Sequence, residues 1–288
     1  MSVKLAKKTG FCFGVKRAVR MAEEALSGKR PIYSLGSIIH NRQVVEGLSK
    51  KGLKVIKDIN NIKKGVLVIS SHGLSPRKQS SIARRGIDII DTTCPFVLNA
   101  QRIAKRLSSE GYTVVIVGDG RHPEVKALVD FAARNVYVVK DRTEARSLKL
   151  GRNDKVSIIS QTTQSKGNFS DVVKTLAEKG PKELRVFNTI CEDAESRQAA
   201  AKELSAQMEL MIVIGGRNSA NTKRLLEVCS GVAKAAHLIE TEGEVDEDWI
   251  RPGMSIGITS GASTPDWMVK RVVKRINSKF RKQKSKKS

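Results

Sequence analysis

The sequence has 288 residues, 40% of them apolar and only 4% aromatic, and its formal net charge is +24. This length allows one large domain or two to three small ones with cores of mainly aliphatic side chains. The excess of basic residues favours anionic substrates or polyanionic partners. The sequence has no apolar run near the roughly 18 residues that cross a bilayer, and its start lacks the apolar stretch of a signal peptide. We therefore expect a cytoplasmic protein without a membrane span, whose four cysteines serve metal binding or catalysis rather than disulfides.

Short β-type apolar runs alternate with helical patterns along the chain, which is typical of parallel α/β units. Each third of the chain has four expected strands. In chain order they are 3–6, 31–36, 53–58 and 66–70, then 87–91, 113–118, 136–141 and 156–160, then 184–187, 210–216, 235–240 and 254–259. The sequence thus predicts three similar α/β domains at 1–86, 87–183 and 184–278, followed by a disordered basic tail at 279–288.

Polar residues recur at matching places in the three thirds. A cysteine follows the first expected strand of each third, and a polar residue follows the second strand 28 residues later in all three cases. Another polar residue follows the fourth strand. The three sets are Cys12, Cys94 and Cys191; His40, His122 and Ser219; and His72, Thr162 and Ser263.

Ligand sites of parallel α/β sheets lie beyond the carboxyl ends of the strands. Three such sheets around a pseudo-threefold axis could therefore direct the three cysteines toward one central point. Helix N-termini favour thiolates, and three thiolates suit either a zinc ion or a 4Fe–4S cluster with one open position. The local spacing does not decide between the two. Cys229 and His237 lie outside the repeated positions, and we expect them to be core or edge residues.

The remaining loops have features of phosphate sites. Segments 215–225 and 259–268 place small and polar residues at expected helix starts, where backbone N–H groups can bind an anion. Any one of these polar residues could equally be a helix cap. His40 and His72 could add charge-assisted hydrogen bonds, and Glu124, next to His122 in the second third, could transfer a proton.

The sequence resembles the 4-hydroxy-3-methylbut-2-enyl diphosphate reductase family from about residue 3 to about residue 276. The motifs that match are numerous and spread along the chain. They are FCFGVKRAV (11–19), IIHNRQVVEGL (38–48), SSHGLSPR (70–77), TTCPFV (92–97), HPEV (122–125), SQTT (160–163), NSAN (218–221) and GASTPDW (261–267).

The resemblance implies a cloverleaf of three parallel-sheet α/β domains around one 4Fe–4S cluster per chain, with one iron not bound by protein. It implies reductive removal of the substrate's hydroxyl group, yielding isopentenyl and dimethylallyl diphosphates as the last step of the non-mevalonate pathway. Flavodoxin or ferredoxin usually donates the electrons. The matching positions imply a role for each residue: Cys12, Cys94 and Cys191 as cluster ligands, His40, His72, Ser219, Asn221 and Ser263 around the diphosphate, and His122, Thr162 and the proton donor Glu124 near the hydroxyl.

Three places depart from the family pattern. Ala220 replaces a usual serine, Arg121 replaces a usual glycine, and residues 192–196 after the third cysteine differ. No expected cluster ligand is among them, and neither is Glu124.

The sequence is also compatible with two other functions. A zinc hydrolase could use the same three thiolates. The high positive charge could instead indicate a nucleic-acid-binding protein on a retained enzyme scaffold. Nucleic acid could bind the basic tail without being the main function.

Overall fold

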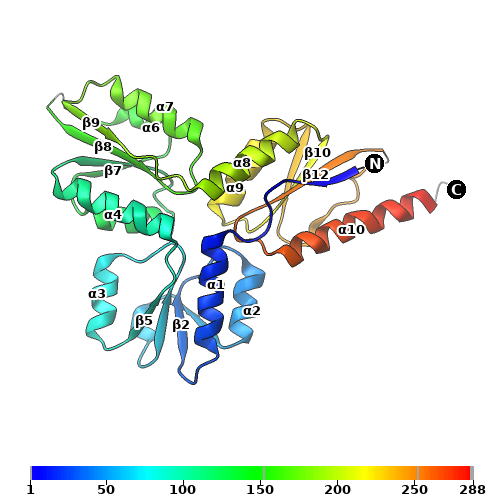
Figure 1. Ribbon diagram of the computed structural model, residues 1–288, viewed down its shortest axis with the longest axis horizontal. Coiled ribbons are helices and arrows are strands. Elements are labelled where there is room, and N and C mark those ends of the chain that lie inside the picture. The colour runs from blue at the N-terminus through cyan, green and yellow to red at the C-terminus, as the bar shows by residue number, and fades with distance from the viewer. Residues whose placement is uncertain (1, 152, 252, 286–288) are drawn as a thin grey trace. The chain divides into compact units, whose positions relative to one another are not determined.

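A computed structural model describes residues 2–151, 153–251 and 253–285 of the chain (Figure 1). The twelve strands of these residues form three four-stranded sheets in which all neighbouring strands are parallel. Every expected strand forms, with ends that differ by at most two residues from the expected ones. The α/β class with three parallel sheets is therefore confirmed.

The chain divides into two compact units. Unit 1 consists of Met1–Phe13, His40–Arg42 and Glu192–Ser288, and unit 2 consists of Gly14–Ile39 and Gln43–Cys191. Unit 1 contains one sheet and unit 2 contains the other two.

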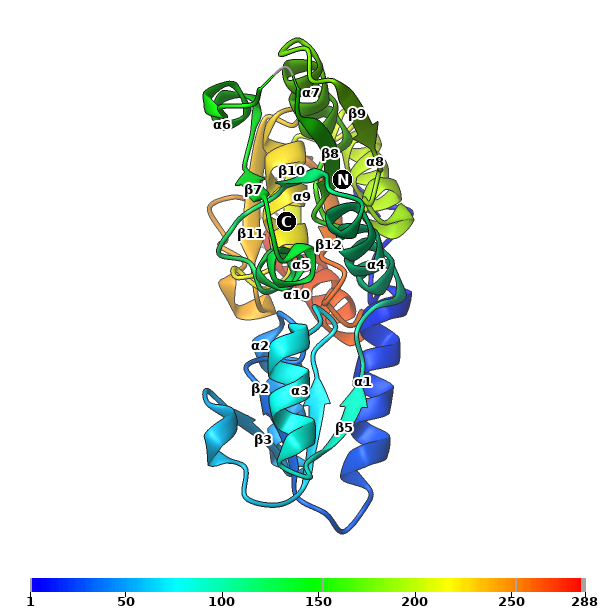
Figure 2. The same cartoon turned by 90° about the vertical axis from the view of Figure 1, so that its left-hand side faces the viewer.

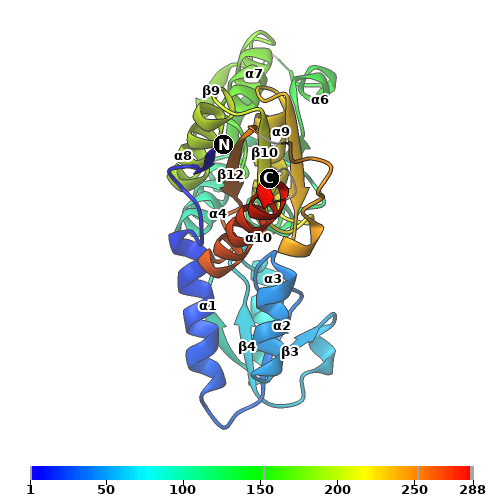
Figure 3. The same ribbon diagram turned by 90° about the vertical axis from the view of Figure 1, so that its right-hand side faces the viewer.

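The sheet of unit 1 has the strand order β1-β12-β10-β11, with helices on both faces (Figure 3). On one face, Val272 of α10 packs in the same cluster as Ile212 of β10. On the other, Ala201 of α8 and Leu225 of α9 pack with Val213, because successive strand residues point to opposite faces. The elements are β1 (Ser2–Leu5), α8 (Glu192–Ser205), β10 (Leu210–Ile214), α9 (Ala220–Ser230), β11 (Ala235–Ile239), η2 (Glu242–Glu244), β12 (Ser255–Ser260) and α10 (Asp266–Ser285).

The first sheet of unit 2 has the order β3-β2-β4-β5. Figure 1 shows α3 on one side of this sheet and α1 and α2 on the other. Ile82 of α3 packs with Leu67 of β4 and with Ile89 of β5. The elements are α1 (Phe13–Leu26), β2 (Ile32–Leu35), α2 (Arg42–Lys50), β3 (Leu53–Ile56), η1 (Ile59–Asn61), β4 (Val66–Ile69), α3 (Pro76–Arg84) and β5 (Asp88–Asp91).

The second sheet of unit 2 has the order β7-β6-β8-β9 and also lies between two layers of helices (Figure 2). Leu107 of α4 and Leu128 of α5 pack with Ile116 of β6, whereas Val172 of α7 packs with Val115 on the opposite face. The elements are α4 (Pro95–Ser109), β6 (Thr113–Val117), α5 (Pro123–Ala132), β7 (Val136–Val139), α6 (Arg142–Ser147), β8 (Lys155–Ser160), α7 (Lys166–Ala177) and β9 (Glu183–Val186).

The first strand of each third of the sequence pairs with the last strand of another third. β5 pairs with β4, β9 pairs with β8, and β1 pairs with β12. The sheets therefore do not coincide with the expected domains 1–86, 87–183 and 184–278. Because parallel strands end at the same sheet edge, this pairing brings the loop after each first strand beside the loop after its partner.

The C-terminal helix α10 continues to Ser285, well into the segment 279–288 for which the sequence predicts disorder. Residues 286–288 lie outside the described residues. Among the described helices, none has the length and apolar character needed to span a membrane.

Candidate active site

The three repeated cysteines occupy equivalent positions in the fold. The backbone N–H of Cys12 donates to the carbonyl of Ala262 at 3.0 Å, that of Cys94 to Ser71 at 3.0 Å, and that of Cys191 to Thr162 at 2.9 Å. Each acceptor lies in the loop after the strand that pairs with the strand preceding the cysteine. Among the described residues, none of these three cysteines forms a disulfide, and each is partly exposed.

Cys94 lies at the N-cap of α4, where the next residue is Pro95. Burial raises the pKa of its thiol, and the negative charge of Glu124 raises it further. The backbone N–H groups of Phe96 and Val97 and the charge of Arg17 act in the opposite direction. The helix start thus supplies N–H groups that can stabilise the thiolate.

Two residues of α1 lie against the Cys94 loop. A Cβ added to Gly14 would be only 2.6 Å from the Cys94 sulfur, so no larger residue fits there without a shift. The guanidinium of Arg17 donates to the carbonyl of Thr93 at 3.2 Å. Both residues belong to unit 2, as does Cys94.

Cys229 differs from the other cysteines, as expected. Its side chain is fully buried in the cluster formed by α8, β10 and α9. Burial raises the pKa of its thiol, and a hydrogen bond with Ser205 opposes that shift. His237 lies on the edge strand β11, where its ring stacks on Trp249 with centroids 3.9 Å apart.

Glu124 and Thr162 form a buried pair at the carboxyl ends of the second sheet of unit 2. The backbone N–H of Thr162 donates to Oε1 of Glu124 at 2.6 Å, and its hydroxyl donates to Oε2 at 2.9 Å. Glu124 is only 2% exposed. Burial raises the pKa of its carboxyl to about 7, although the two bonds from Thr162 act to lower it. This group can therefore hold or release a proton near neutral pH.

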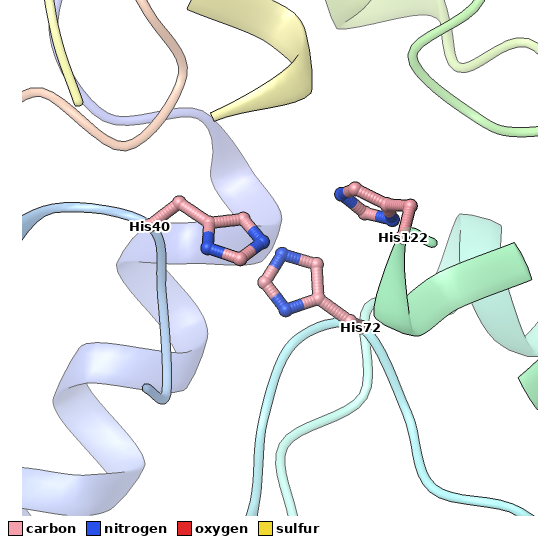
Figure 4. Close-up of side chains that lie close together, drawn as sticks. All are labelled: His40, His72 and His122. Carbon is pink, nitrogen blue, oxygen red and sulfur yellow. The ribbon is translucent and has the colours of Figure 1, made fainter. Parts of the chain in front are cut away.

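His122 and His72 lie close together in the same unit (Figure 4). Their ring centroids are 5.3 Å apart and the rings are nearly perpendicular. His122 is the N-cap of α5, and its Nδ1 accepts the backbone N–H of Glu124 at 3.2 Å. A neutral His122 ring with Nδ1 as acceptor carries its hydrogen on Nε2.

A second polar group lies in unit 1, where α9 begins. The hydroxyl of Ser263 donates to the carbonyl of His40 at 3.0 Å, and a Cβ on Gly216 would lie 2.5 Å from that oxygen. Ser219 is the N-cap of α9 and accepts the N–H of Thr222 at 3.3 Å, so it is indeed a helix cap. Burial lowers the pKa of His40, and the charge of Lys223 lowers it further.

Asn221 is buried at the start of α9. It is 4% exposed, and within the described ranges neither its Nδ2 nor its Oδ1 has a hydrogen-bond partner. A buried amide in this state has a substantial free-energy cost, which a ligand could remove.

The predicted site residues therefore fall into two groups. Unit 1 holds Cys12, His40, Ser219, Asn221 and Ser263, and unit 2 holds Cys94, Cys191, His72, His122, Glu124 and Thr162. Gly14 and Arg17 are not among the site residues that the sequence predicts. The position of Gly14 inside an expected helix, two residues after a repeated cysteine, could have indicated that another part of the chain approaches it closely.

Two of the three departures from the family pattern, Arg121 and segment 192–196, form local ion pairs. Nε of Arg121 lies 3.3 Å from an oxygen of Asp119 at the surface. Asp193, within the departing segment 192–196, forms an ion pair with the buried Arg197 at 2.7 Å, and Arg197 also donates to the carbonyl of Ser260 at 3.3 Å. Ala220 is the first residue of α9.

The parallel sheets carry three cysteines in the loops at their carboxyl ends and a buried acid at the start of α5, an arrangement typical of α/β enzymes. The sequence matches the profile of the LytB protein family over residues 3–277. A relative from Geobacter sulfurreducens, named 4-hydroxy-3-methylbut-2-enyl diphosphate reductase, is 47% identical over 276 residues that cover 96% of this chain and 97% of the relative. The chain therefore belongs to the LytB family and is an oxidoreductase.

Two solved structures agree with this assignment. One is the E-1-hydroxy-2-methyl-but-2-enyl-4-diphosphate reductase from Plasmodium falciparum, with a TM-score of 0.89 and 29% identity, covering 94% of this chain and 86% of that chain. The other is an (E)-4-hydroxy-3-methyl-but-2-enyl diphosphate reductase, described as the terminal enzyme of the non-mevalonate pathway. Its TM-score is 0.68 at 38% identity, with 96% of this chain and 100% of that chain covered.

Proposed function

We propose that this chain removes the hydroxyl group of 4-hydroxy-3-methylbut-2-enyl diphosphate, as the last step of the non-mevalonate pathway. The reaction consumes two electrons and two protons and yields water together with isopentenyl or dimethylallyl diphosphate. The observation that carries the proposal is the buried Glu124, whose pKa is raised to about 7, in a chain 47% identical to a reductase of that name. An acid with this pKa is suited to protonate a leaving hydroxyl group.

Cys12, Cys94 and Cys191 would hold a 4Fe–4S cluster, one per chain, with one iron not bound by a protein side chain. Their partial exposure and equivalent backbone bonds support this assignment, because the fourth cysteine, Cys229, is buried elsewhere. Thiolates are the usual ligands of such clusters. Gly14, two residues after Cys12 in the sequence, leaves space beside the Cys94 sulfur. A bound cluster would supply electrons and a Lewis-acidic iron for the substrate oxygen.

The diphosphate would be bound by Ser219, Asn221, Ser263 and His40 of unit 1, with His72 assigned the same role from the family resemblance. The unpartnered amide of Asn221 supports this, because its N–H could donate to a phosphate oxygen. The start of α9 adds backbone N–H groups and the positive end of the helix dipole. Binding the non-reacting diphosphate would orient the allylic carbons for reaction.

Glu124, Thr162 and His122 would control the proton. The N–H of Thr162 is fixed on Oε1 of Glu124, which leaves Oε2 as the oxygen to be protonated. When Oε2 carries the proton, it can donate to the Thr162 hydroxyl, which then turns its own hydrogen toward the substrate. His122 can donate from Nε2 to the same substrate oxygen, because its Nδ1 accepts a backbone N–H.

A reduced flavodoxin or ferredoxin would deliver the electrons in the cytoplasm. No cysteine of the described residues forms a disulfide, which agrees with a reducing compartment. Phe13 and Phe96, each next to or near a predicted ligand in the sequence, are 68% and 39% exposed and offer apolar contact surface. The net charge of +24 would attract an acidic electron donor.

Anaerobic purification followed by an assay with a reduced viologen dye tests the proposed function. We expect a brown protein that oxidises the dye only when the allylic diphosphate is added. A protein with a full complement of iron and sulfide that leaves the dye reduced in the presence of that substrate would overturn the proposal.

A further inference from the structure

The first turn of α9 is an incomplete site for a negatively charged group. No acidic residue occupies this turn, and Ser219 is its N-cap. Asn221 is 4% exposed, and both polar atoms of its side-chain amide lack partners within the part of the chain that the structure describes. The loop at His40 reaches the same place, because a Cβ on Gly216 would lie 2.5 Å from the His40 carbonyl oxygen.

Lys223 is placed to reach this turn. Its backbone N–H donates to the carbonyl of Ser219 at 3.0 Å, so the two residues lie on the same face of α9. Long side chains of a helix point back toward its N-terminus. The charge of Lys223 also contributes, after burial, to the lowered pKa of His40, which agrees with a position near that ring.

No acidic partner of Lys223 within the described residues explains this position. Lys223 is exposed, and no ion pair involves it in the described part of the chain, whereas its neighbour Arg224 pairs with Glu227 at 2.5 Å. A cation in the first turn of a helix is unfavourable because it faces the positive end of the helix dipole. If an anion were bound at the start of α9, the ammonium group of Lys223 would be attracted to it, and this position would become favourable.

We propose that Lys223 is a further binding residue for the diphosphate, and that it favours diphosphate over monophosphate esters. The inference rests on the proposed function, since the α9 start must bind the substrate's phosphates. A diphosphate carries more negative charge than a monophosphate, so a single added cation stabilises it more. The flexible ammonium group can meet whichever oxygens Ser219 and Asn221 leave free.

Calorimetric titration of the anaerobic holoenzyme with inorganic pyrophosphate and with inorganic phosphate tests this proposal. Lys223→Gln should weaken pyrophosphate binding about tenfold, the size of one charge-assisted hydrogen bond, and phosphate binding less. Lys223→Arg should restore most of the affinity. The matched control is Arg224→Gln, which removes the neighbouring charge and should leave both affinities unchanged.

Equal pyrophosphate affinity in wild type and Lys223→Gln would overturn the inference, as would an equal loss in both glutamine variants. Wild-type protein that does not bind pyrophosphate would overturn it too. The proposed function is tested separately: a protein that binds pyrophosphate through Lys223 but never oxidises the dye would contradict only the proposed reaction.

Discussion

Burial and hydrogen bonding act in opposite directions on the carboxyl group of Glu124. Burial raises its pKa to about 7, whereas the N–H and hydroxyl of Thr162 favour the charged form. The two bonds fix the orientation of the carboxyl group, and burial keeps it partly protonated at neutral pH. A group in this balance is suited to donate a proton and to be reprotonated in each turnover.

Glu124→Gln should preserve this local structure and stop proton donation. The amide oxygen can accept from the Thr162 N–H and the amide N–H can donate to its hydroxyl. We expect turnover at least about 10²-fold slower with a similar Michaelis constant. Steady-state kinetics with a reduced dye checks this, and near-normal turnover would show that another group donates the proton.

The same substitution should change how stability depends on pH. The folded pKa of Glu124 is raised from 4.5 to about 7, so the folded state holds this proton more tightly than the unfolded state. The protonated Glu124 therefore stabilises the fold fully below the unfolded-state pKa of 4.5. This stabilisation, about 3 kcal/mol in total, is lost as the pH rises through the folded-state pKa of about 7. The free energy of unfolding of Glu124→Gln, compared with that of wild type, should therefore increase as the pH rises from about 4 to about 8. Thermal unfolding at both pH values measures this, and a pH-independent difference would contradict the raised pKa.

A third prediction at the residue scale concerns the four cysteines. Cys12→Ser, Cys94→Ser and Cys191→Ser should each lose the cluster absorbance and reduce activity by at least about 10²-fold, since each removes one metal ligand. Cys229→Ser should retain both, because its side chain lies in an aliphatic cluster. Iron analysis and visible absorbance check this. A folded, colourless Cys229→Ser protein would refute the ligand assignment.

At the scale of elements, the close approach of α1 to the start of α4 depends on a glycine. A Cβ on Gly14 would lie 2.6 Å from the Cys94 sulfur, below any normal contact distance. Gly14→Ala should therefore displace that sulfur, lower the iron content and destabilise the fold by about 1–3 kcal/mol. Iron analysis and thermal unfolding provide the measurement.

Gly47→Ala in α2 is the matched control for this substitution. Gly47 is also a helical glycine, but nothing lies within 4 Å of its added Cβ. Alanine there should leave the iron content unchanged and stabilise the helix by about 0.5–1 kcal/mol. Similar iron loss in both variants would show that the Gly14 contact is not specific.

The sequence was sufficient to predict the strands and the loops that carry the cysteines, because both depend on local patterns. Val114 to Val117, for example, is an aliphatic run followed by glycine, which reads as a buried strand. The contact between Gly14 and Cys94 could not be read in this way, since it joins residues far apart in the chain. The same holds for the bond from Thr162 that orients Glu124.

At the scale of the whole chain, two features differ from the sequence-based expectation of three consecutive domains and a disordered tail. Pairing of β1 with β12 joins the two ends of the sequence in one sheet, which only tertiary packing decides. The helix α10 passes residue 279 because the segment lacks helix breakers and is rich in Lys, Arg and Gln, which are good helix formers.

Deleting residues 279–288 should leave folding and catalysis intact. The core residues of α10, Val269, Val272 and Ile276, all precede the deletion. Binding to a polyanion such as heparin should weaken by about tenfold or more at low salt, because several Lys and Arg residues are lost. Activity assays and heparin binding at two salt concentrations check this. A folded truncation without reductase activity would contradict it.

Identification of the reaction products by NMR tests directly whether this enzyme removes the hydroxyl group of the allylic diphosphate. The anaerobic enzyme would be given a chemical reductant and 4-hydroxy-3-methylbut-2-enyl diphosphate, and the carbon skeleton would be followed over time. We expect isopentenyl and dimethylallyl diphosphate to replace the substrate, and Glu124→Gln to form them at least about 10²-fold more slowly. A reduced, cluster-containing enzyme that leaves the hydroxyl group on the substrate would contradict it.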